Sequence, residues 1–393
     1  MRESWRWFGP DDPVSLEEIR QTGATDIVSA LHHIPIGEVW PRDQIAAHRA
    51  LIESGNVAGS ELHWTVVESI PVHDDIKLAS DGHKTYVDAW IESMENLAAE
   101  GVKTICYNFM PVIDWTRTDL KYQLPNGAFA LRFDQDRFAA FDLFILQRTG
   151  AKHDYSDEEI ARAKSAFDDM SAEDIAALTK TIIAGLPGKM TEAYSLDDFR
   201  RALARYADID HGRLRANLIG FLERVLPAAE KLDVMLAIHP DDPPWDMFGL
   251  PRVICTPDDL DKLFTAAPSP SNGMTLCVGT YGSRPDNDLP QMARDYRDRI
   301  HFAHLRGVTR DASEQRSFVE ASHLDSDIDM VRVIRNLLEN EGATSREIFI
   351  RPDHGHLMMG DVRRTSNPGY SAIGRMKGLA EIRGVIRAVS EVG

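Results

Sequence analysis

The sequence predicts a (β/α)8 barrel, or TIM barrel, formed by a single domain over residues 1–393. Three observations support this fold class. Strand-like apolar segments alternate with helix-like segments along the chain, and eight such strands can be counted. Four of the later strands each end on a His, Cys or Asp side chain. No Gly-x-Gly-x-x-Gly fingerprint follows an early strand, which disfavours a dinucleotide-binding sheet. The regular alternation favours a barrel over an open doubly wound sheet.

The first half of the chain contains four of the expected strands. Ser15 and Glu18 have the spacing of a capping box and mark the start of the first helix, which Gly23 ends. The later helices of this half are expected at 42–54 and 84–99. The strands are expected at residues 5–8, 26–31, 62–68 and 103–109.

The second half repeats the same rhythm, with one helix leading into each strand. The four strands are expected at residues 234–239, 274–277, 300–304 and 348–353. The helices are expected at residues 214–232, 257–266, 288–296 and 328–340, with a final helix at 373–389.

One connection is too long for a simple βα unit, which predicts a mostly helical insertion after strand four, at residues 114–212. The segment 121–133 is expected to form a hairpin that turns at Asn126-Gly127. Helix starts are expected at Ser156, Ser171 and Ser195. On a barrel, such an insertion lies at the C-terminal face and can serve as a lid or a dimer contact, although a surface decoration is an alternative.

Composition narrows the range of partners and locations. The formal net charge of -18 disfavours binding to nucleic acid, because an acidic surface repels phosphates. The 3 cysteines form no disulfide framework and fit a reducing compartment. No apolar run approaches the roughly 18 residues that span a bilayer. We therefore expect a soluble cytoplasmic protein with no membrane contact.

The strand ends carry a set of metal-type ligands. His239, Cys277, His304 and Asp353 each close an apolar strand, and all four fall at the end of the barrel that holds the chemistry of such enzymes. Four ligands of this kind leave coordination positions open for water or substrate on a five- or six-coordinate ion. By ligand type, zinc or Fe(II) is preferred, Mn(II) is possible, and Mg(II) is disfavoured by the thiolate.

Two residues are candidates for acid–base chemistry. His354 follows Asp353 directly, so it can titrate near neutrality and still reach a substrate on the metal. His354 and His356 cannot both face the metal if the loop is extended, and either could instead support a ligand. Tyr370 lies in the loop 365–371 after the last strand and offers a hydroxyl group.

Further residues are candidates for substrate binding. Arg117, in the loop 114–119, could hold a carboxylate bidentately, or it could be a solvated loop residue. Weaker candidates at the strand ends and loops are His32, Glu68, Asn108, Arg306 and His356.

Long runs of this sequence resemble the mannonate dehydratases, within the xylose-isomerase-like group of barrels. The resemblance covers the chain nearly end to end, and runs of this length are far more specific than a short pattern. The matching runs include Trp5-Arg-Trp-Phe-Gly-Pro10, Ala30-Leu-His-His-Ile-Pro35, Cys106-Tyr-Asn-Phe-Met-Pro111, Asp114-Trp-Thr-Arg-Thr-Asp-Leu120, His239-Pro-Asp-Asp-Pro-Pro244, Arg351-Pro-Asp-His-Gly-His356 and Asn367-Pro-Gly-Tyr-Ser-Ala-Ile-Gly-Arg375.

The resemblance implies dehydration of D-mannonate to 2-keto-3-deoxy-D-gluconate in hexuronate breakdown, with Mn2+ or Fe2+. It assigns metal ligation to the same four strand-end residues, and it points to His354 and Tyr370 as the acid–base pair. Which of the two is base and which is acid stays open. The expected partner is a small sugar acid. We also expect a homo-oligomer, and a dimer is compatible with the sequence.

Three other functions remain open at this point. A metal-dependent sugar isomerase on the same barrel would be expected to use a carboxylate-rich, two-metal site with a lysine. A metal-dependent endonuclease is disfavoured by the net charge of -18. A non-catalytic sugar-acid sensor would be favoured by a closed, structural metal site.

Overall fold

The computed structural model describes residues 1–183, 195–314 and 316–392. Eight strands form a closed barrel, and every neighbouring pair of them is parallel. The strands are β1 (Arg2–Arg6), β2 (Asp26–Ser29), β3 (His63–Glu68), β4 (Thr104–Tyr107), β7 (Met235–Ile238), β8 (Asn272–Cys277), β9 (Ile300–His304) and β12 (Phe349–Arg351). Their order around the barrel is β1-β12-β9-β8-β7-β4-β3-β2, which confirms the predicted TIM barrel.

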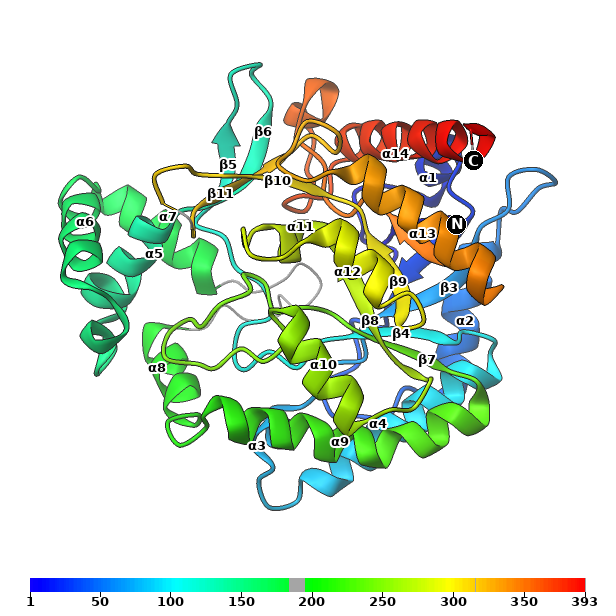
Figure 1. The fold of residues 1–393 in the computed structure, drawn as a ribbon, viewed down its shortest axis with the longest axis horizontal. Helices are drawn as coiled ribbons and strands as arrows, with labels where there is room; N and C mark the ends of the chain where they lie inside the picture. The colour runs from blue at the N-terminus through cyan, green and yellow to red at the C-terminus, as the bar shows by residue number, and fades with distance from the viewer. Residues whose placement is uncertain (184–194, 315, 393) are drawn as a thin grey trace.

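Helices surround this barrel on its outside (Figure 1). Ser15 and Glu18 form the expected capping box at the first helix, and Gly23 ends that helix with a φ of 79°. The helices that follow the barrel strands are α1 (Leu16–Thr22), α2 (Arg42–Glu53), α3 (Asp74–Leu78), α4 (His83–Ala99), α10 (Pro257–Ala266), α11 (Val278–Gly282), α12 (Leu289–Asp295), α13 (Met330–Thr344), the short 3-10 helix η3 (Met359–Arg363) and α14 (Ala372–Val392).

The interior of the barrel is filled by side chains from the strands. One buried cluster takes a single residue from each of five strands: Val28, Val66, Cys106, Ala237 and Phe302. A layer of this kind makes the barrel a packed core and not a pore. The functional side chains must therefore lie beyond this layer, where the strands end.

The long connection after β4 has the predicted character. It begins with the hairpin β5 (Asp119–Gln123) and β6 (Phe129–Phe133), whose turn includes Gly127 at a φ of 83°. Ser156 and Ser195 each form a capping box, and the side chain of Ser171 accepts from the backbone of Asp174. The helical elements are α5 (Gln135–Ala140), η1 (Phe141–Leu146), η2 (Ala151–Asp154), α6 (Asp157–Asp168), α7 (Ala172–Ile183), α8 (Leu196–Ala204) and α9 (His211–Leu232).

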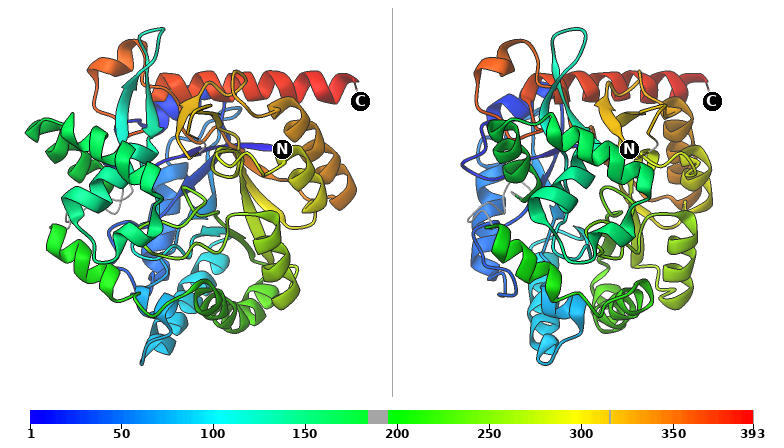
Figure 2. Two further views of the ribbon diagram at one scale, coloured as in Figure 1. Left: turned by 60° about the vertical axis from the view of Figure 1, so that its left-hand side comes forward. Right: turned by 90° about the vertical axis from the view of Figure 1, so that its left-hand side faces the viewer.

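Helices α5 to α8 project from one side of the barrel (Figure 2). Residues 184–194 of this segment lie outside the described residues. None of the helices in the described part of the chain is long and apolar enough to cross a membrane.

A second, smaller sheet was not predicted. Strands β10 (Gly307–Arg310) and β11 (Phe318–Ala321) extend from the end of β9 and pair with the hairpin in the order β10-β11-β6-β5. The pairing of β11 with β6 is antiparallel and sets Phe318 opposite Phe133. We call these four strands the accessory sheet. It joins the barrel to the long connection after β4.

Candidate active site

The four predicted ligands come together at the carboxyl ends of neighbouring barrel strands. The register sets Cys277 on β8 beside His304 on β9, and His304 beside Arg351 on β12. One ligand atom from each of His239, Cys277 and His304 lies within 4.8 Å of the others. Asp353 Oδ2 lies 3.8 Å from Cys277 Sγ and 3.9 Å from His304 Nδ1. The spacing of the first three side chains suits a metal ion, and Asp353 lies beside two of them.

The protonation of these groups suits a cation. His239 Nδ1 donates to the Pro240 carbonyl oxygen at 2.7 Å, so Nε2 is left for a ligand role. Burial alone would lower the pKa of His239, but contact with Cys277 outweighs it and raises the pKa to about 9. Binding of a metal ion at this imidazole would release its proton.

His304 and Asp353 fit the same interpretation. Both ring nitrogens of His304 are buried without a hydrogen-bond partner, and burial lowers its pKa well below the ordinary value. Burial alone would raise the pKa of Asp353, but the charge of Arg351 and then that of His354 hold it well below its usual range. A neutral imidazole and an ionised carboxylate are the forms that bind a metal.

A second trio of metal-type side chains, made of Glu68, Cys106 and His304, also lies within 4.8 Å. Burial raises the pKa of Cys106 well above its ordinary value, so its thiol stays protonated. Its sulfur already receives a hydrogen bond from the Thr275 hydroxyl at 3.2 Å. Because metals bind the thiolate, the trio with Cys106 is the weaker candidate.

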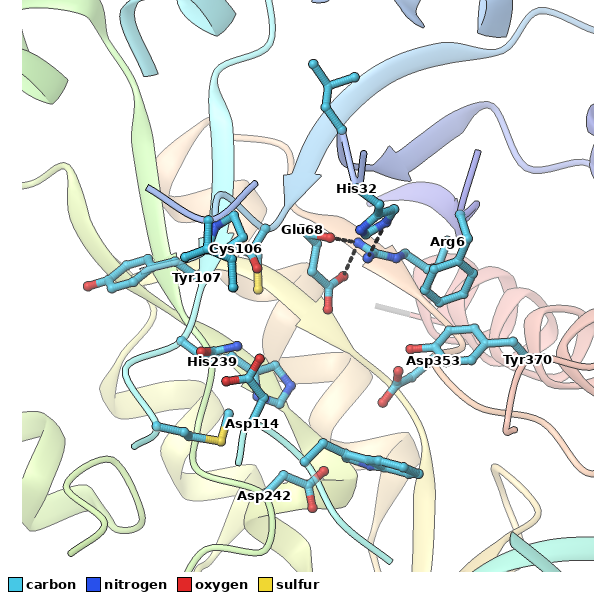
Figure 3. Close-up of a pocket in the computed structure, with 18 of the residues that line it drawn as sticks. Arg6, His32, Glu68, Cys106, Tyr107, Asp114, His239, Asp242, Asp353 and Tyr370 are labelled. Carbon is cyan, nitrogen blue, oxygen red and sulfur yellow. Dashed lines mark hydrogen bonds and ion pairs between the residues drawn. The ribbon is translucent and has the colours of Figure 1, made fainter. Parts of the chain in front are cut away.

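A cavity of about 410 Å³ opens over the ligand cluster, and Figure 3 shows the side chains that face it. His239 and Asp353 form part of its lining, as do both acid–base candidates, His354 and Tyr370. Four of the weaker candidates from the sequence also line it: His32, Glu68, Asn108 and Arg306.

The two acid–base candidates face each other across one edge of this cavity. Their rings meet edge to face, with centroids 4.9 Å apart and an interplanar angle of 76°. His354 Nδ1 lies 2.7 Å from Glu320 Oε2, while Nε2 lies 3.8 Å from Asp353 Oδ1. Burial raises the pKa of Tyr370 to about 12, so the phenol keeps its proton at neutral pH.

Two predicted substrate-binding residues are not in the cavity. Arg117 is fully buried, and its guanidinium is held by Asp242 at 2.7 Å and by Glu320 at 2.8 Å. It does not line the cavity, so the expectation that it grips the substrate carboxylate has no support in the structure. His356 likewise lies behind the wall, where its Nε2 donates to the backbone carbonyl of Glu320 at 2.9 Å.

Two charged residues of the cavity wall, Arg6 and Arg351, were missed by the sequence analysis, whereas Arg306 was a candidate. Arg351 lines the cavity, donates to Glu68 Oε1 at 2.8 Å and lies 2.6 Å from Asp353 Oδ1. Arg306 donates to Asp353 Oδ2 at 2.7 Å, and Arg6 donates to the Glu68 carbonyl oxygen. The alternation of a strand would have indicated Arg351, because it lies two residues before Asp353 and so shares its face.

These arginines set guanidinium groups in the cavity wall, beside the carboxylates of Glu68, Asp242 and Asp353. Arg6, Arg306 and Arg351 all line it, and each is at most 7 % exposed. Guanidinium groups in such a low-dielectric wall attract an anionic ligand and can hold a carboxylate bidentately. The site is thus suited to a small, polar, anionic molecule.

Fold and site together define a TIM-barrel enzyme whose cavity lies over a His-Cys-His cluster with the spacing of a metal site. The chain belongs to the D-mannonate dehydratase (UxuA) family, whose model matches residues 1–393. It is 52% identical over 391 residues to the mannonate dehydratase of Brucella canis, covering 99% of this chain and 97% of that protein.

Solved structures agree with this assignment. The crystal structure of mannonate dehydratase from Streptococcus suis serotype 2 superposes with a TM-score of 0.79 at 32% identity, over 100% of this chain and 95% of that one. A D-allulose 3-epimerase from Methylomonas sp. matches with a TM-score of 0.50 at 10% identity, over 98% of each chain, which shows a shared fold alone.

Proposed function

We propose that this chain dehydrates D-mannonate to 2-keto-3-deoxy-D-gluconate and water, with Mn2+ or Fe2+ as cofactor, in hexuronate catabolism. The observation that carries the proposal is the convergence of His239, Cys277 and His304 within 4.8 Å, with Asp353 beside them, under a cavity lined by arginines. The 52% identity to a protein named mannonate dehydratase supports the choice of substrate.

The four strand-end side chains would hold the metal. The bound ion would supply Lewis-acid stabilisation of the negative charge that develops on the substrate when the C2 proton leaves. Mixed nitrogen, sulfur and oxygen ligands fit Mn(II) and Fe(II), and availability would decide between them. Arg306 and Arg351 hold both oxygens of Asp353, so they orient this ligand.

The chemistry requires one base and one acid. We assign the base to His354, whose Nε2 would take the proton from C2, so that the C2–H electron pair is held on the C1 carboxylate as an enediolate. That pair would then form the C2=C3 double bond as the C3–O bond breaks, and the oxygen would leave as water with a proton from Tyr370. The pKa of about 12 for Tyr370 supports its role as the proton donor. The resulting enol tautomerises to the keto acid.

The remaining cavity residues would bind the substrate. We propose that Arg6 and Arg306 attract its carboxylate, and that His32, Glu68 and Asn108 contact its hydroxyl groups. All five line the cavity. We further propose that residues 114–212 are an insertion within one barrel domain. We also propose that the enzyme is cytoplasmic and forms a homo-oligomer, with a dimer as the expected state.

The test is turnover by protein that is stripped of metal and then reloaded anaerobically with Mn(II), with Fe(II) or with buffer alone. Formation of the keto acid from D-mannonate is followed, with D-gluconate and D-altronate as controls. We expect metal-dependent product from D-mannonate alone. Absence of product from every aldonate, despite bound metal, would contradict the proposal and favour the sensor or the isomerase.

A further inference from the structure

The two carboxylate oxygens of Glu320 have different hydrogen-bond partners. The residue lies on β11 of the accessory sheet and is 4 % exposed. Oε2 lies 2.7 Å from Nδ1 of His354. Oε1 accepts from Arg117 Nη2 at 2.8 Å and from Arg306 Nη1 at 3.1 Å. The two arginines therefore hold the carboxylate in place from one side while the imidazole meets its other side.

The charge of Glu320 decides the direction of the bond to His354. Burial alone would raise the pKa of Glu320, but the charges of His354, Arg306 and Arg117 hold it well below its usual range. An ionised carboxylate can only accept hydrogen bonds. His354 Nδ1 must therefore carry the proton that is donated to Oε2, so Nε2 is the ring nitrogen that is left to act on a substrate.

The ring is also held in orientation by its neighbours. Its edge-to-face contacts are with Trp115, at a centroid distance of 6.0 Å, and with Tyr370, at 4.9 Å. Nε2 lies 3.8 Å from Asp353 Oδ1, on the side of the ligand cluster. A substrate bound at that cluster would therefore meet Nε2.

We propose that Glu320 is a positioning residue, which fixes the tautomer and the orientation of His354 so that its Nε2 lone pair faces the substrate. This inference rests on the proposed function, in which His354 removes the C2 proton. A carboxylate that holds an imidazole in one tautomer plays the same part in serine hydrolases. Here the carboxylate comes from outside the barrel.

The accessory sheet explains how Glu320 keeps its place. Residues Phe318 and Val319, just before it on β11, pair with Phe133 and Arg132 on β6 of the hairpin. Its own backbone carbonyl accepts from His356 Nε2 at 2.9 Å. The hairpin after β4 thus supports a residue that acts on His354, and His356 acts as a support and not as a metal ligand.

The kinetic test replaces Glu320 by Gln. An amide can donate to Nδ1, so the tautomer with its proton on Nε2 becomes available and the base is lost. We expect kcat to fall by about 10²–10⁴-fold, with KM for D-mannonate and bound metal unchanged. Asp242→Asn is the matched control, because Asp242 also pairs with Arg117 and Arg306 at 2.7 Å each but, among the described residues, accepts no hydrogen bond from His354.

A spectroscopic test reads the tautomer directly. The protein is labelled with ¹⁵N-histidine and loaded with diamagnetic Zn(II), and the His354 signals are identified by their loss in His354→Asn. We expect the proton on Nδ1 in the wild type and in Asp242→Asn, and on Nε2 in part or all of the Glu320→Gln molecules. A proton on Nε2 in the wild type would overturn the proposal.

Unchanged kcat in Glu320→Gln with the wild-type tautomer would overturn it as well. If that variant fails to fold, the wild-type spectrum still decides. The tautomer is read without turnover, so a wild type that fails to dehydrate D-mannonate defeats the proposed function separately from the position of the proton.

Discussion

Replacement of Arg117 by Met should lower the thermal stability of the protein and leave substrate affinity unchanged. The guanidinium is fully buried and makes five hydrogen bonds, four of them to the carboxylates of Asp242 and Glu320. Removing one partner of a buried ion pair costs about 3–5 kcal/mol. Because Arg306 still pairs with both carboxylates, we expect the lower value, about 3 kcal/mol.

That loss corresponds to a melting temperature lower by about 6 °C, at about 2 °C per kcal/mol for a large domain. Arg117→Lys keeps the charge but loses the planar fork, so about half of this shift is expected. Arg364→Met is the matched control, since its pair with Glu18 is partly exposed, at 36 and 37 % of the two side chains, and such pairs contribute about 0–1 kcal/mol.

The assay combines a thermal melt of the metal-loaded protein with steady-state kinetics on D-mannonate. We expect the melting temperature to fall, KM to stay within about twofold, which corresponds to less than about 0.5 kcal/mol, and kcat to fall because Glu320 is less well held. A normal melting temperature together with a strongly raised KM would refute this reasoning. It would show that Arg117 contacts the substrate carboxylate, as the sequence suggested.

Three further predictions follow from the site and the barrel. Cys277→Ser replaces the soft ligand by a hydroxyl and should weaken binding of Fe(II) by about tenfold or more, measured by chelator competition; unchanged affinity would remove Cys277 from the metal site. Tyr370→Phe should lower kcat by about 10²–10⁴-fold with bound metal unchanged, and a small effect on kcat would exclude Tyr370 as the acid. Burial, its largest cause, lowers the pKa of His301 to about 3 in the folded protein, from about 6.5 in the unfolded chain. The stability from this group is thus complete above about pH 6.5 and is lost as the pH falls towards 3, so His301→Gln should reduce the acid slope of the unfolding free energy by up to about 1.4 kcal/mol per pH unit. Urea unfolding at several pH values tests this, and an unaltered slope would contradict it.

The barrel and the convergence of its strand-end side chains could be predicted because their signals are local. Each barrel strand is a short apolar run next to a helix, and the strands are parallel, so their carboxyl ends must meet at one face. Cys277 and His304 needed no contact information to be placed together, since both close such a run. The first strand lies at Arg2–Arg6 and not at residues 5–8, because pairing with β12 and β2 begins at the N-terminus.

The buried contacts of Arg117 with Glu320 and Asp242 could not be predicted from the sequence in the same way. The hydrogen bond between Arg117 and Glu320 joins residues that are 203 positions apart. Neither of the two segments has a sequence pattern that predicts this contact. Arg117 looked like a loop residue available to substrate because a loop is ordinarily solvated. Asp242 and the aromatic rings of Trp115 and Phe318, each 4.9 Å from its guanidinium, bury it instead. Burial of that kind is a property of tertiary packing.

Two different parts of the structure supply the metal-ligand candidates and the carboxylate that contacts His354. The strand ends of the barrel present the proposed metal ligands, and the positions of these side chains follow from the closed sheet. His354, the proposed base, needs a hydrogen-bond partner at Nδ1, on the side of its ring that faces away from the proposed ligands. The barrel strands are not placed to supply this partner, because their ends point towards the proposed metal site. The accessory sheet supplies that partner, Glu320, from a strand that the hairpin after β4 completes. In the mechanism we propose, the long connection after β4 supports Glu320 and through it the placement of His354, so we expect changes at Arg117 and Glu320 to alter kcat before KM.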